Sequence, residues 1–323
     1  MRMLPQRVDG DHAPVRAFRG ATSPQSSLKN SVSDRSHRSA NSVIEAFPDT
    51  TTVAVVIVNF FKADRLVECV RSLARQSGAQ KMTVAVVENS ADSGEHQRLA
   101  KAAAEHGFVL VNPELNLGYT KGCNLGVQAL APTDFVVLCN PDIIWDEPDS
   151  IERLIAIAAS DPSIGVVAPL QVSDDGALVE TARNFPTLLH QLKRRLWPER
   201  GNEIHLIDPL AEGKTDLIDV DWLQSSCVVI RRSLWNRLGG LDQRYFLFMS
   251  DVELGRATWN QGMRVCLTSS VRVRADGKRA SAGGFRSLLT SRTQRSHLRD
   301  AIRYYLANGF RSGRRPLLPD ASS

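Results

Sequence analysis

Short apolar runs alternate with amphipathic stretches between residues 53 and 170. The runs are rich in β-branched residues and lack polar alternation, which is typical of strands buried on both faces of a sheet. Strands are predicted over residues 53–58, 83–87, 108–111, 135–139 and 164–168. Helices are predicted between them, over residues 64–76, 94–106, 121–130 and 150–160. This alternation predicts an α/β fold with a mainly parallel sheet and helices on both faces.

The pattern loosens after residue 170. Pro186, Pro198 and Pro209 interrupt the stretch up to residue 215, where loops are predicted. A second structured part follows, with strands predicted over 220–230 and 263–267 and helices over 234–238 and 251–261. Residues 1–50 contain eight serines between Ser23 and Ser42 and no apolar core of the signal-peptide type, so they are predicted to be a disordered extension.

The cysteines and the lengths of the apolar runs narrow the cellular setting. The five cysteines have no short paired spacing, which argues against a zinc site and a disulfide framework and favours a reducing cytosol. No apolar run approaches the length of a membrane span. A cytoplasmic protein is therefore expected.

Polar side chains follow the first three predicted strands at the point where each strand ends. Asn59 follows the first strand and Glu88 the second, and a stretch with Asn116, two glycines and Asn124 follows the third. Open α/β sheets bind their ligands at the carboxyl ends of strands, so these residues predict one ligand cleft. The glycine-rich signatures of a dinucleotide site and of a phosphate loop are both absent after the first strand.

The fourth predicted strand ends in Asn140, Pro141 and Asp142. Two oxygen side chains around a rigid proline suit a hard cation that carries a diphosphate. The same three residues are also ordinary turn chemistry. The other polar strand ends favour the cation site, because all of them would meet at one edge of the sheet.

The order of these pieces resembles the family 2 glycosyltransferases, and most closely the rhamnosyltransferase-like branch. The matching segments are 56–60, 87–90, 116–124, 140–142, 222–232, 239–242 and 245–254. The resemblance covers about residues 53–280 and implies a GT-A fold, a nucleotide-sugar donor, Mg²⁺ or Mn²⁺, and inverting transfer to a glycan or lipid-linked glycan. It implies that residues 51–170 bind the nucleotide sugar, whereas residues 171–280 bind the acceptor and carry catalysis.

The resemblance also implies roles for single residues. On the donor side it implies nucleoside contacts from Asn59, Glu88, Asn116 and Asn124, and a metal held by Asp142 with help from Asn140. On the acceptor side it implies Asp251 as the catalytic base, with Trp222 and Ser225 where the acceptor sits. Inverting transfer needs a base for the acceptor hydroxyl and a cation for the leaving diphosphate, so two carboxylates are the minimum.

A structural interpretation of Asp251 competes with the catalytic one. Ser250, followed three residues later by Glu253, has the spacing of a capping box at the start of a helix. Asp251 would then be a favourable acid in the first helical turn. Both interpretations are compatible, since a helix start presents a carboxylate rigidly.

The chain departs from the family pattern at three places. Glu88 stands where the family has Asp, Ser250 stands where it has an acid, and no histidine lies between His205 and His297. The family often has a histidine near residues 274–277, and Asp276 or Lys278 could substitute for it. These departures leave open a degenerate member that binds nucleotide sugar or glycan beside a partner enzyme. A nucleotidyltransferase is a further alternative, but it would need a basic glycine-rich loop after the first strand.

The basic residues concentrate at the C-terminus, in the predicted helix and tail 281–323. Residues 272–315 hold twelve Lys and Arg against two Asp, whereas the whole chain carries only +5. By spacing, one helical face carries Arg292, Arg295, Arg299 and Arg303, and a neighbouring face carries Leu298, Ile302, Tyr305 and Leu306. A basic amphipathic helix predicts peripheral binding to the inner face of the plasma membrane. A solvated surface helix and nucleic-acid binding are the alternatives, and no nucleic acid is expected.

Together these features predict a bacterial-type glycosyltransferase. The candidate sugar is rhamnose, donated from its deoxythymidine diphosphate form to a growing surface glycan.

Overall fold

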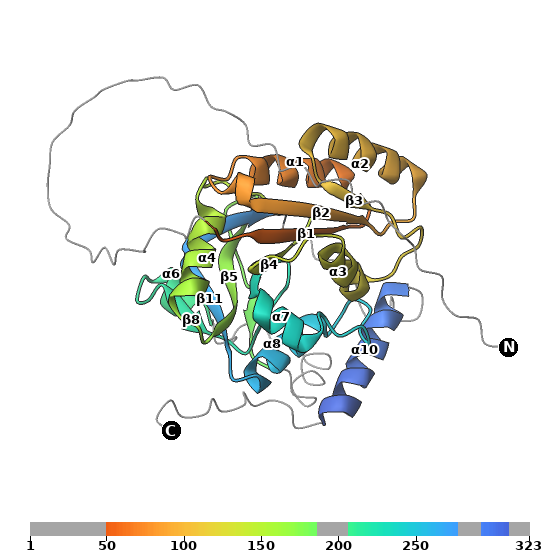
Figure 1. The fold of residues 1–323 in the computed structure, drawn as a ribbon. Coiled ribbons are helices and arrows are strands. Elements are labelled where there is room, and N and C mark those ends of the chain that lie inside the picture. Colours follow the sequence, from red (N-terminus) through yellow and green to blue (C-terminus); the bar gives the residue numbers. More distant parts are fainter. Residues whose placement is uncertain (1–49, 186–205, 277–291, 310–323) are drawn as a thin grey trace, which may run out of the picture.

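The computed structural model describes residues 50–185, 206–276 and 292–309 (Figure 1). A nine-stranded sheet runs through the described residues. Its strand order is β3-β2-β1-β4-β10-β5-β11-β8, with β6 paired to β5. Strands from both halves of the sequence therefore share one sheet.

The first half of the sheet is parallel. Its strands are β1 (Val53–Asn59), β2 (Met82–Glu88), β3 (Val109–Val111) and β4 (Phe135–Cys139). The intervening helices are α1 (Ala63–Ala74), α2 (Ser93–His106) and α3 (Tyr119–Gln128), with a short 3₁₀ turn η1 (Ala79–Lys81) before β2. Asn59 and Glu88 are register partners at the ends of β1 and β2. The parallel pairing thus brings the predicted strand-end residues to one edge.

The second half of the sheet is mixed. Its strands are β5 (Ile164–Ser173), β6 (Leu178–Val179), β8 (Leu217–Asp219), β10 (Cys227–Arg231) and β11 (Arg264–Ala275), and a separate pair consists of β7 (Ala182–Arg183) and β9 (Trp222–Leu223). Strand β10 runs antiparallel between β4 and β5, and Cys227 pairs with Cys139. The start of β10 therefore lies beside the carboxyl end of β4, where Asn140 and Asp142 emerge.

Helices cover both faces of the sheet (Figure 1). One core packs under α1, α2 and α4 (Ser150–Ser160), and the other packs under α3, α7 (Arg232–Leu238), α8 (Ser250–Asn260) and α10 (Arg292–Asn308). The short helix α6 (Asp208–Ala211) borders the second core. Alternate residues of β1 serve the two cores, since Val55 and Ile57 enter the first and Ala54 and Val56 the second. This arrangement confirms the predicted α/β class.

Most of the predicted elements are present, and β4 and α4 have the predicted bounds. The single strand predicted over 220–230 is wrong, because it divides into β9 and β10 around residues 224–226. The Gln224 N–H donates to the Thr181 carbonyl at 2.9 Å, and the Ser226 carbonyl accepts from the Asn140 N–H at 2.7 Å. These polar residues bond to loops instead of to neighbouring strands, and so they end the pairing.

The predicted C-terminal helix is present as α10, and its predicted apolar face is only partly exposed. Tyr305 is buried in the second core together with Ala301 and Tyr304. Leu298, Ile302 and Leu306 are 45%, 51% and 73% exposed. The outer apolar stripe therefore consists of these three residues.

Several predictions fall on other residues. The disorder expected for residues 1–49, the loops at 186–205, Lys278, and the side chains of Arg292 and Arg295 lie outside what the structure describes. Within the described helices, none is long and apolar enough to cross a membrane.

Candidate functional site

The ends of β1 and β2 form a buried polar network. Asn59 is fully buried, and its Nδ2 donates to Oε2 of Glu88 at 2.8 Å and to Oε2 of Glu95 at 2.9 Å. Its Oδ1 accepts the Lys62 N–H, and Oε1 of Glu88 accepts the Ser90 N–H at 2.6 Å. Asn59 and Glu88 thus fix the loops that follow their strands. Glu95, on α2, also belongs to this network, and no local sequence pattern predicts its part in it.

Two aromatic rings stand on the loop that this network holds. Phe60 and Phe61 are 52% and 56% exposed and pack edge to face, with ring centroids 4.9 Å apart. Phe61 has a φ of 53°, and its N–H donates to Oγ of Ser90 at 2.8 Å. A bulky residue in this region of φ is strained, and strained residues are common at binding sites. The rings offer exposed apolar faces beside the polar strand ends, and the pattern of polar strand ends did not predict them.

Asn116 and Asn124 lie in different surroundings. Asn116 is exposed, and its Oδ1 accepts the Gly118 N–H at 2.8 Å and Nδ2 of Asn89 at 3.1 Å. Asn124 is 4% exposed, and both polar atoms of its amide bond to the Leu241 backbone, at 2.8 and 2.9 Å. Asn116 therefore shapes the loop beside β2, whereas Asn124 joins α3 to the loop after α7. A nucleoside contact from Asn124 would require both bonds to open.

A second cluster forms at the ends of β4 and β11. Ile144 and Arg274 exchange backbone hydrogen bonds at 2.9 and 3.0 Å, which brings Asp142 and Asp276 together. Nζ of Lys62, from the loop after β1, lies 3.3 Å from Oδ2 of Asp142 and 2.8 Å from Oδ2 of Asp276. A positive charge thus already sits between the two carboxylates.

The ionisation of this cluster reflects its burial. Asp142 is 7% exposed, and burial together with the hydrogen bond to Asp276 raises the pKa of its carboxyl, although Lys62 acts in the opposite direction. Burial opposes the charge on Lys62, but the hydrogen bond to Asp276 and the charge of Asp142 outweigh it and raise the pKa of the ammonium. The site therefore favours a cation beside its carboxylates.

The donor set suits a hard cation. No group of three or more His, Cys, Asp or Glu residues that could hold a metal occurs among the described residues. Asp142 and Asp276 nevertheless provide two carboxylates, and Asn140 stands two residues before Asp142. Mg²⁺ is commonly bound through one or two carboxylates together with substrate phosphates and water, so a larger protein cage is not needed.

Asp251 lies in the first turn of α8 and faces the start of β10. Oγ of Ser225 donates to its Oδ1 at 2.5 Å, and Oγ of Ser250 lies 3.4 Å from the same oxygen. The Tyr119 hydroxyl donates to the Ser225 carbonyl at 2.8 Å, which fixes the residue that holds the carboxylate. Burial raises the pKa of Asp251 to about 6, against the opposing effect of the Ser225 hydrogen bond. This is a suitable pKa for a general base near neutral pH.

The capping-box interpretation of this helix start is wrong. The N-cap is Met249, in a left-handed conformation with φ 64°, and it makes no side-chain capping bond. Oγ of Ser250 donates to the Leu247 carbonyl at 3.1 Å, so it does not accept an N–H of the helix. The carboxylate of Glu253 accepts from Nδ2 of Asn308 on α10 instead.

Trp222 lies on β9, against α8. Its side chain is partly buried, and Nε1 donates to the Asn184 carbonyl at 2.9 Å. A Cβ at Gly255 would lie 2.6 Å from both the Asp221 carbonyl oxygen and Cβ of Trp222, so only glycine allows α8 to approach β9 this closely. The close packing fixes the position of the first turns of α8, and so of Asp251, relative to β9.

The backbone joins the two carboxylate centres. The Asn140 N–H donates to the Ser226 carbonyl at 2.7 Å, and the neighbouring Ser225 holds Asp251. Ser226 is itself fixed by hydrogen bonds to the side chain of Gln171. The end of β4 and the start of β10 therefore place the Lys62–Asp142–Asp276 cluster and the Asp251 carboxylate on the same edge of the sheet.

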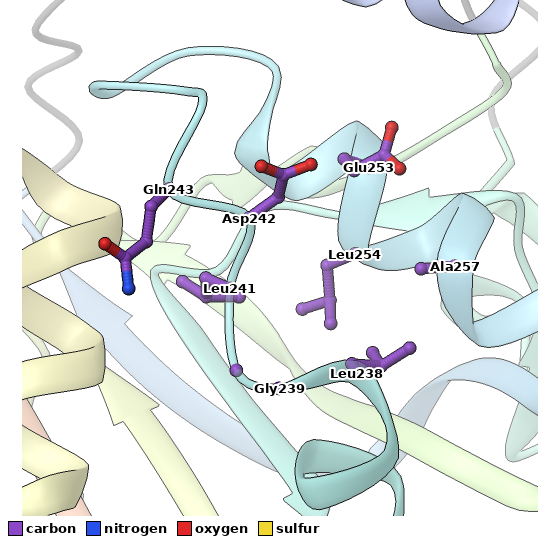
Figure 2. A pocket seen from close by; sticks show the side chains of 9 residues that line it. Leu238, Gly239, Leu241, Asp242, Gln243, Glu253, Leu254 and Ala257 are labelled. Carbon is purple, nitrogen blue, oxygen red and sulfur yellow. The ribbon is translucent and has the colours of Figure 1, made fainter.

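A pocket of about 280 Å³ lies on the other side of α8 (Figure 2). Figure 2 shows the carboxylates of Asp242 and Glu253 at one end and Leu238, Leu241 and Leu254 below them. Its lining includes none of the residues predicted for donor, metal, base or acceptor. The pocket is thus separate from the strand-end site.

The fold, with an antiparallel strand inserted beside a polar strand-end site, is that of a GT-A glycosyltransferase. A mannosyltransferase from Pyrobaculum calidifontis, solved with GDP-Man and Mn²⁺, superposes with a TM-score of 0.52 at 18% identity over 74% of this chain and 61% of its own. GalNAc-T7, solved with UDP, GalNAc and Mn²⁺, gives 0.59 at 14% identity over 80% of this chain and 48% of its own. At these identities the likeness shows the fold, and it confirms the predicted GT-A class.

Residues 48–296 match the model of the family described as "Glycosyltransferase like family 2", and the chain belongs to this family. It is 30% identical, over 223 residues, to the N-acetylglucosaminyl-diphospho-decaprenol L-rhamnosyltransferase of Mycobacterium tuberculosis, covering 64% of this chain and 70% of that protein. It is 26% identical to the O-antigen biosynthesis protein RfbC of Myxococcus xanthus, over 69% of this chain but 17% of RfbC. The predicted resemblance, including its rhamnosyltransferase-like branch, is confirmed, and the protein is a glycosyltransferase.

Proposed function

We propose that this glycosyltransferase moves a sugar from a nucleoside diphosphate donor to a lipid-diphosphate-linked sugar, with inversion at the anomeric carbon. Rhamnose is the candidate sugar, because the mycobacterial relative is named as a rhamnosyltransferase and its name includes a diphospho-decaprenol. The observation that carries the proposal is the partly buried Asp251 carboxylate, held by Ser225 and with a pKa of about 6. A carboxylate of this kind can take a proton near neutral pH.

Asp251 acts as the general base in this proposal. Its Oδ1 is held by Ser225, so Oδ2 takes the proton of the acceptor hydroxyl. The hydroxyl oxygen bonds to the anomeric carbon as the bond to the donor diphosphate breaks, and the nucleoside diphosphate leaves. Proton transfer to a positioned base typically contributes about 10²–10⁴-fold to the rate. Trp222 and Ser225 line the acceptor side of this carboxylate.

On the donor side we assign the aromatic pair and the asparagine loop to the nucleoside. Phe60 is exposed beside the Asn59–Glu88 network, so its ring is available to stack on a base. The Asn116 loop faces the same end of β2 through its bond to Asn89. Asn59 and Glu88 then act by fixing these loops.

Asp142 and Asp276, with Asn140, would hold Mg²⁺ or Mn²⁺. When bound, the cation would offset the negative charge that develops on the leaving diphosphate. Asp276 supplies the ligand that the family takes from a histidine, since its carboxylate lies beside Asp142 after β11. Lys62 provides positive charge at the same place, and on release from the carboxylates its ammonium can pair with the donor phosphates.

A membrane surface is the proposed location of the acceptor. Leu298, Ile302 and Leu306 form an exposed stripe along α10, and the exposed Arg299 and Arg303 lie beside it. Apolar residues next to arginines suit an interface of anionic lipids. The enzyme would then meet its lipid-linked acceptor while bound peripherally to that surface.

The test is nucleoside diphosphate release by the purified protein across a panel of nucleotide sugars, with and without a lipid-diphosphate sugar acceptor and Mg²⁺ or Mn²⁺. The proposal expects release with one donor that requires both acceptor and metal, and a product of inverted anomeric configuration by NMR. Donor binding without turnover under every acceptor would instead indicate a degenerate member that assists a partner enzyme.

A further inference from the structure

One carboxylate of α10 accepts hydrogen bonds from three backbone N–H groups of the segment that precedes Asp251. Oδ2 of Asp300 accepts from Phe246 at 3.0 Å and from Leu247 and Phe248 at 3.1 Å each. Asp300 is fully buried. Three successive N–H groups around one oxygen form an anion-binding nest, and hydrogen bonds to a charged acceptor are stronger than those between neutral groups. We call residues 245–249 the base loop.

Helix α3 holds the opposite side of the base loop. The Tyr119 N–H donates to the Phe246 carbonyl at 2.7 Å, and the Thr120 hydroxyl donates to the Tyr245 carbonyl. Gly118 has a φ of 82°, and a Cβ there would lie 2.5 Å from the Phe246 oxygen. The base loop is therefore clamped between the start of α3 and the carboxylate of Asp300.

The base loop ends in a strained residue. Met249 has a φ of 64° and is the N-cap of α8, two residues before Asp251. A non-glycine residue in this region is strained and persists where its surroundings enforce it. The nest on Asp300 fixes the three residues before Met249, so it enforces the angle at which the first turn of α8 begins.

Two further bonds from α10 brace the ends of this region. An Nη1 of Arg303 donates to the Arg244 carbonyl at 2.7 Å, and Nδ2 of Asn308 donates to Oε2 of Glu253 at 3.0 Å. Figure 1 shows α10 along the side of the molecule that carries α3, α7 and α8. The contacts of α10 thus extend from just before the base loop to just after Asp251.

We propose that Asp300 is a positioning residue for sugar transfer, whose carboxylate holds the base loop so that Asp251 is presented to the acceptor hydroxyl. This inference rests on the proposed role of Asp251 as the base. Helix α10 would then contribute to the reaction through its inner face, in addition to the membrane contact proposed for its outer face. Asp300 does not touch the reacting atoms, and it acts through the backbone of residues 246–248.

The test compares Asp300→Asn with Ala301→Gly in the full chain. Asp300→Asn removes the charge that the three N–H groups share, whereas Ala301→Gly lowers the helix propensity of α10 and removes no polar contact to the base loop. Turnover is expressed per donor-binding site, so that loss of folded protein does not count as loss of rate. Hydrogen exchange of the amides at 246–248 reports the nest directly. Asp300→Glu serves as a second variant that keeps the charge if Asp300→Asn does not fold.

For Asp300→Asn the inference expects faster exchange at 246–248 and a fall of about 10–100-fold in kcat, with the KM of the donor little changed. The acid limb of the pH profile should move to lower pH, because a loosened loop admits water to Asp251. The polar groups that face Asp251 are Ser225, Ser250, Tyr119 and Cys123, and none of them is altered. Ala301→Gly should keep the wild-type kcat and acid limb.

A lower melting temperature for Asp300→Asn, with wild-type kcat and acid limb per folded site, would overturn the inference and leave Asp300 a structural residue. For Asp300→Glu, wild-type exchange and turnover support the need for a charge, whereas wild-type turnover with unprotected amides at 246–248 would overturn it. If Asp251→Asn itself keeps full turnover, the proposed role of Asp251 as the base fails instead, whatever Asp300→Asn does.

Discussion

The Asp251 carboxylate is partly buried, and the Ser225 hydroxyl donates a hydrogen bond to one of its oxygens. Burial raises its pKa to about 6, and the Ser225 hydrogen bond lowers it. The two effects set the pH at which the carboxylate can accept a proton. The rate should therefore rise with pH through about 6 as Asp251 loses its proton.

Ser225→Ala should move this acid limb to higher pH, because it removes a hydrogen bond that favours the charged carboxylate. Turnover would then fall more at pH 6 than at pH 8. The measurement is the pH profile of kcat/KM, with Ser160→Ala as a control that removes an exposed hydroxyl at the end of α4. An acid limb that stays in place or moves down would show that Ser225 does not tune the base.

A second prediction concerns metal binding by the cluster of Lys62, Asp142 and Asp276. Asp276→Asn should weaken Mn²⁺ binding by about tenfold or more, because one of two anionic ligands is lost. Lys62→Met should strengthen binding in the donor-free protein, because the competing ammonium is removed. Electron paramagnetic resonance of free Mn²⁺ measures both without turnover.

Asp146→Asn is the control for this pair, since Asp146 is a half-exposed acid paired with Arg274 nearby. Unchanged Mn²⁺ affinity in Asp276→Asn would show that Asp276 does not replace the family histidine as a ligand.

At the scale of the element, α10 has a buried inner face and an exposed outer face. Its inner face buries Asp300, Ala301 and Tyr304 against the second core, and its outer face exposes Leu298 and Ile302. An exposed apolar stripe on a helix that packs by its other side is not explained by folding. The proposed membrane binding would account for it.

Replacing Leu298, Ile302 and Leu306 together by Glu should abolish cosedimentation with vesicles of anionic lipid, because the apolar contact is lost and negative charge is added. Turnover on a short-chain, water-soluble acceptor should persist, since these side chains point away from the core. Leu178→Glu is the control, at a leucine that is 43% exposed on β6. Equal cosedimentation of the triple variant and wild type would rule out the stripe as the membrane contact.

The elements that the sequence predicted well are those whose pattern is local. Strand β4 and helix α4 have the predicted bounds because an unbroken β-branched run and a helical period define them without reference to other segments. β11 is longer than predicted, because Arg272–Ala275 pair with the end of β5 after a bulge. The break between β9 and β10 depends on bonds from residues 224–226 to distant loops, which no local pattern reveals.

The same distinction applies to the site. The strand-end residues Asn59, Glu88 and Asp142 could be found in the sequence, since parallel topology brings such ends together. The network partners Glu95 and Asp300 could not be found, because their bonds to Asn59 and to residues 246–248 join segments 36 and 52–54 residues apart. The sequence pattern indicates Asp276 only as a possible substitute for a histidine. In the structure, the pairing of Ile144 with Arg274 places Asp276 beside Asp142.

On the scale of the whole molecule, one sheet joins the proposed donor side to the proposed acceptor side. The parallel strands β1, β2 and β4 carry the Asn59–Glu88 network and Asp142, and the antiparallel β10 brings Ser225 and Asp251 to the same edge. Helices α3 and α10 then hold the base loop from two directions. The fold thus brings the proposed cation site and the proposed base together from segments far apart in the chain.

Asp251 also links function to the stability of the whole molecule. Its folded pKa of about 6 exceeds the ordinary 3.8, so its contribution to the free energy of unfolding is complete below about pH 4 and is lost as the pH rises through 6. Asp251→Asn should therefore be more stable than wild type at pH 8, by about 1–3 kcal/mol, and equal to it at pH 3. Thermal or urea unfolding at the two pH values checks this. A loss of stability at pH 8 would contradict a raised pKa of Asp251 in the folded protein.

The central claim is that Asp251 takes the proton of the acceptor hydroxyl. The most direct test is the single-turnover rate of Asp251→Asn at pH 8 with saturating donor, acceptor and metal, measured beside the dissociation constant of the donor. The account predicts a rate about 10²–10⁴-fold below wild type with unchanged donor affinity. A rate near that of wild type would contradict it and would assign the proton to another group.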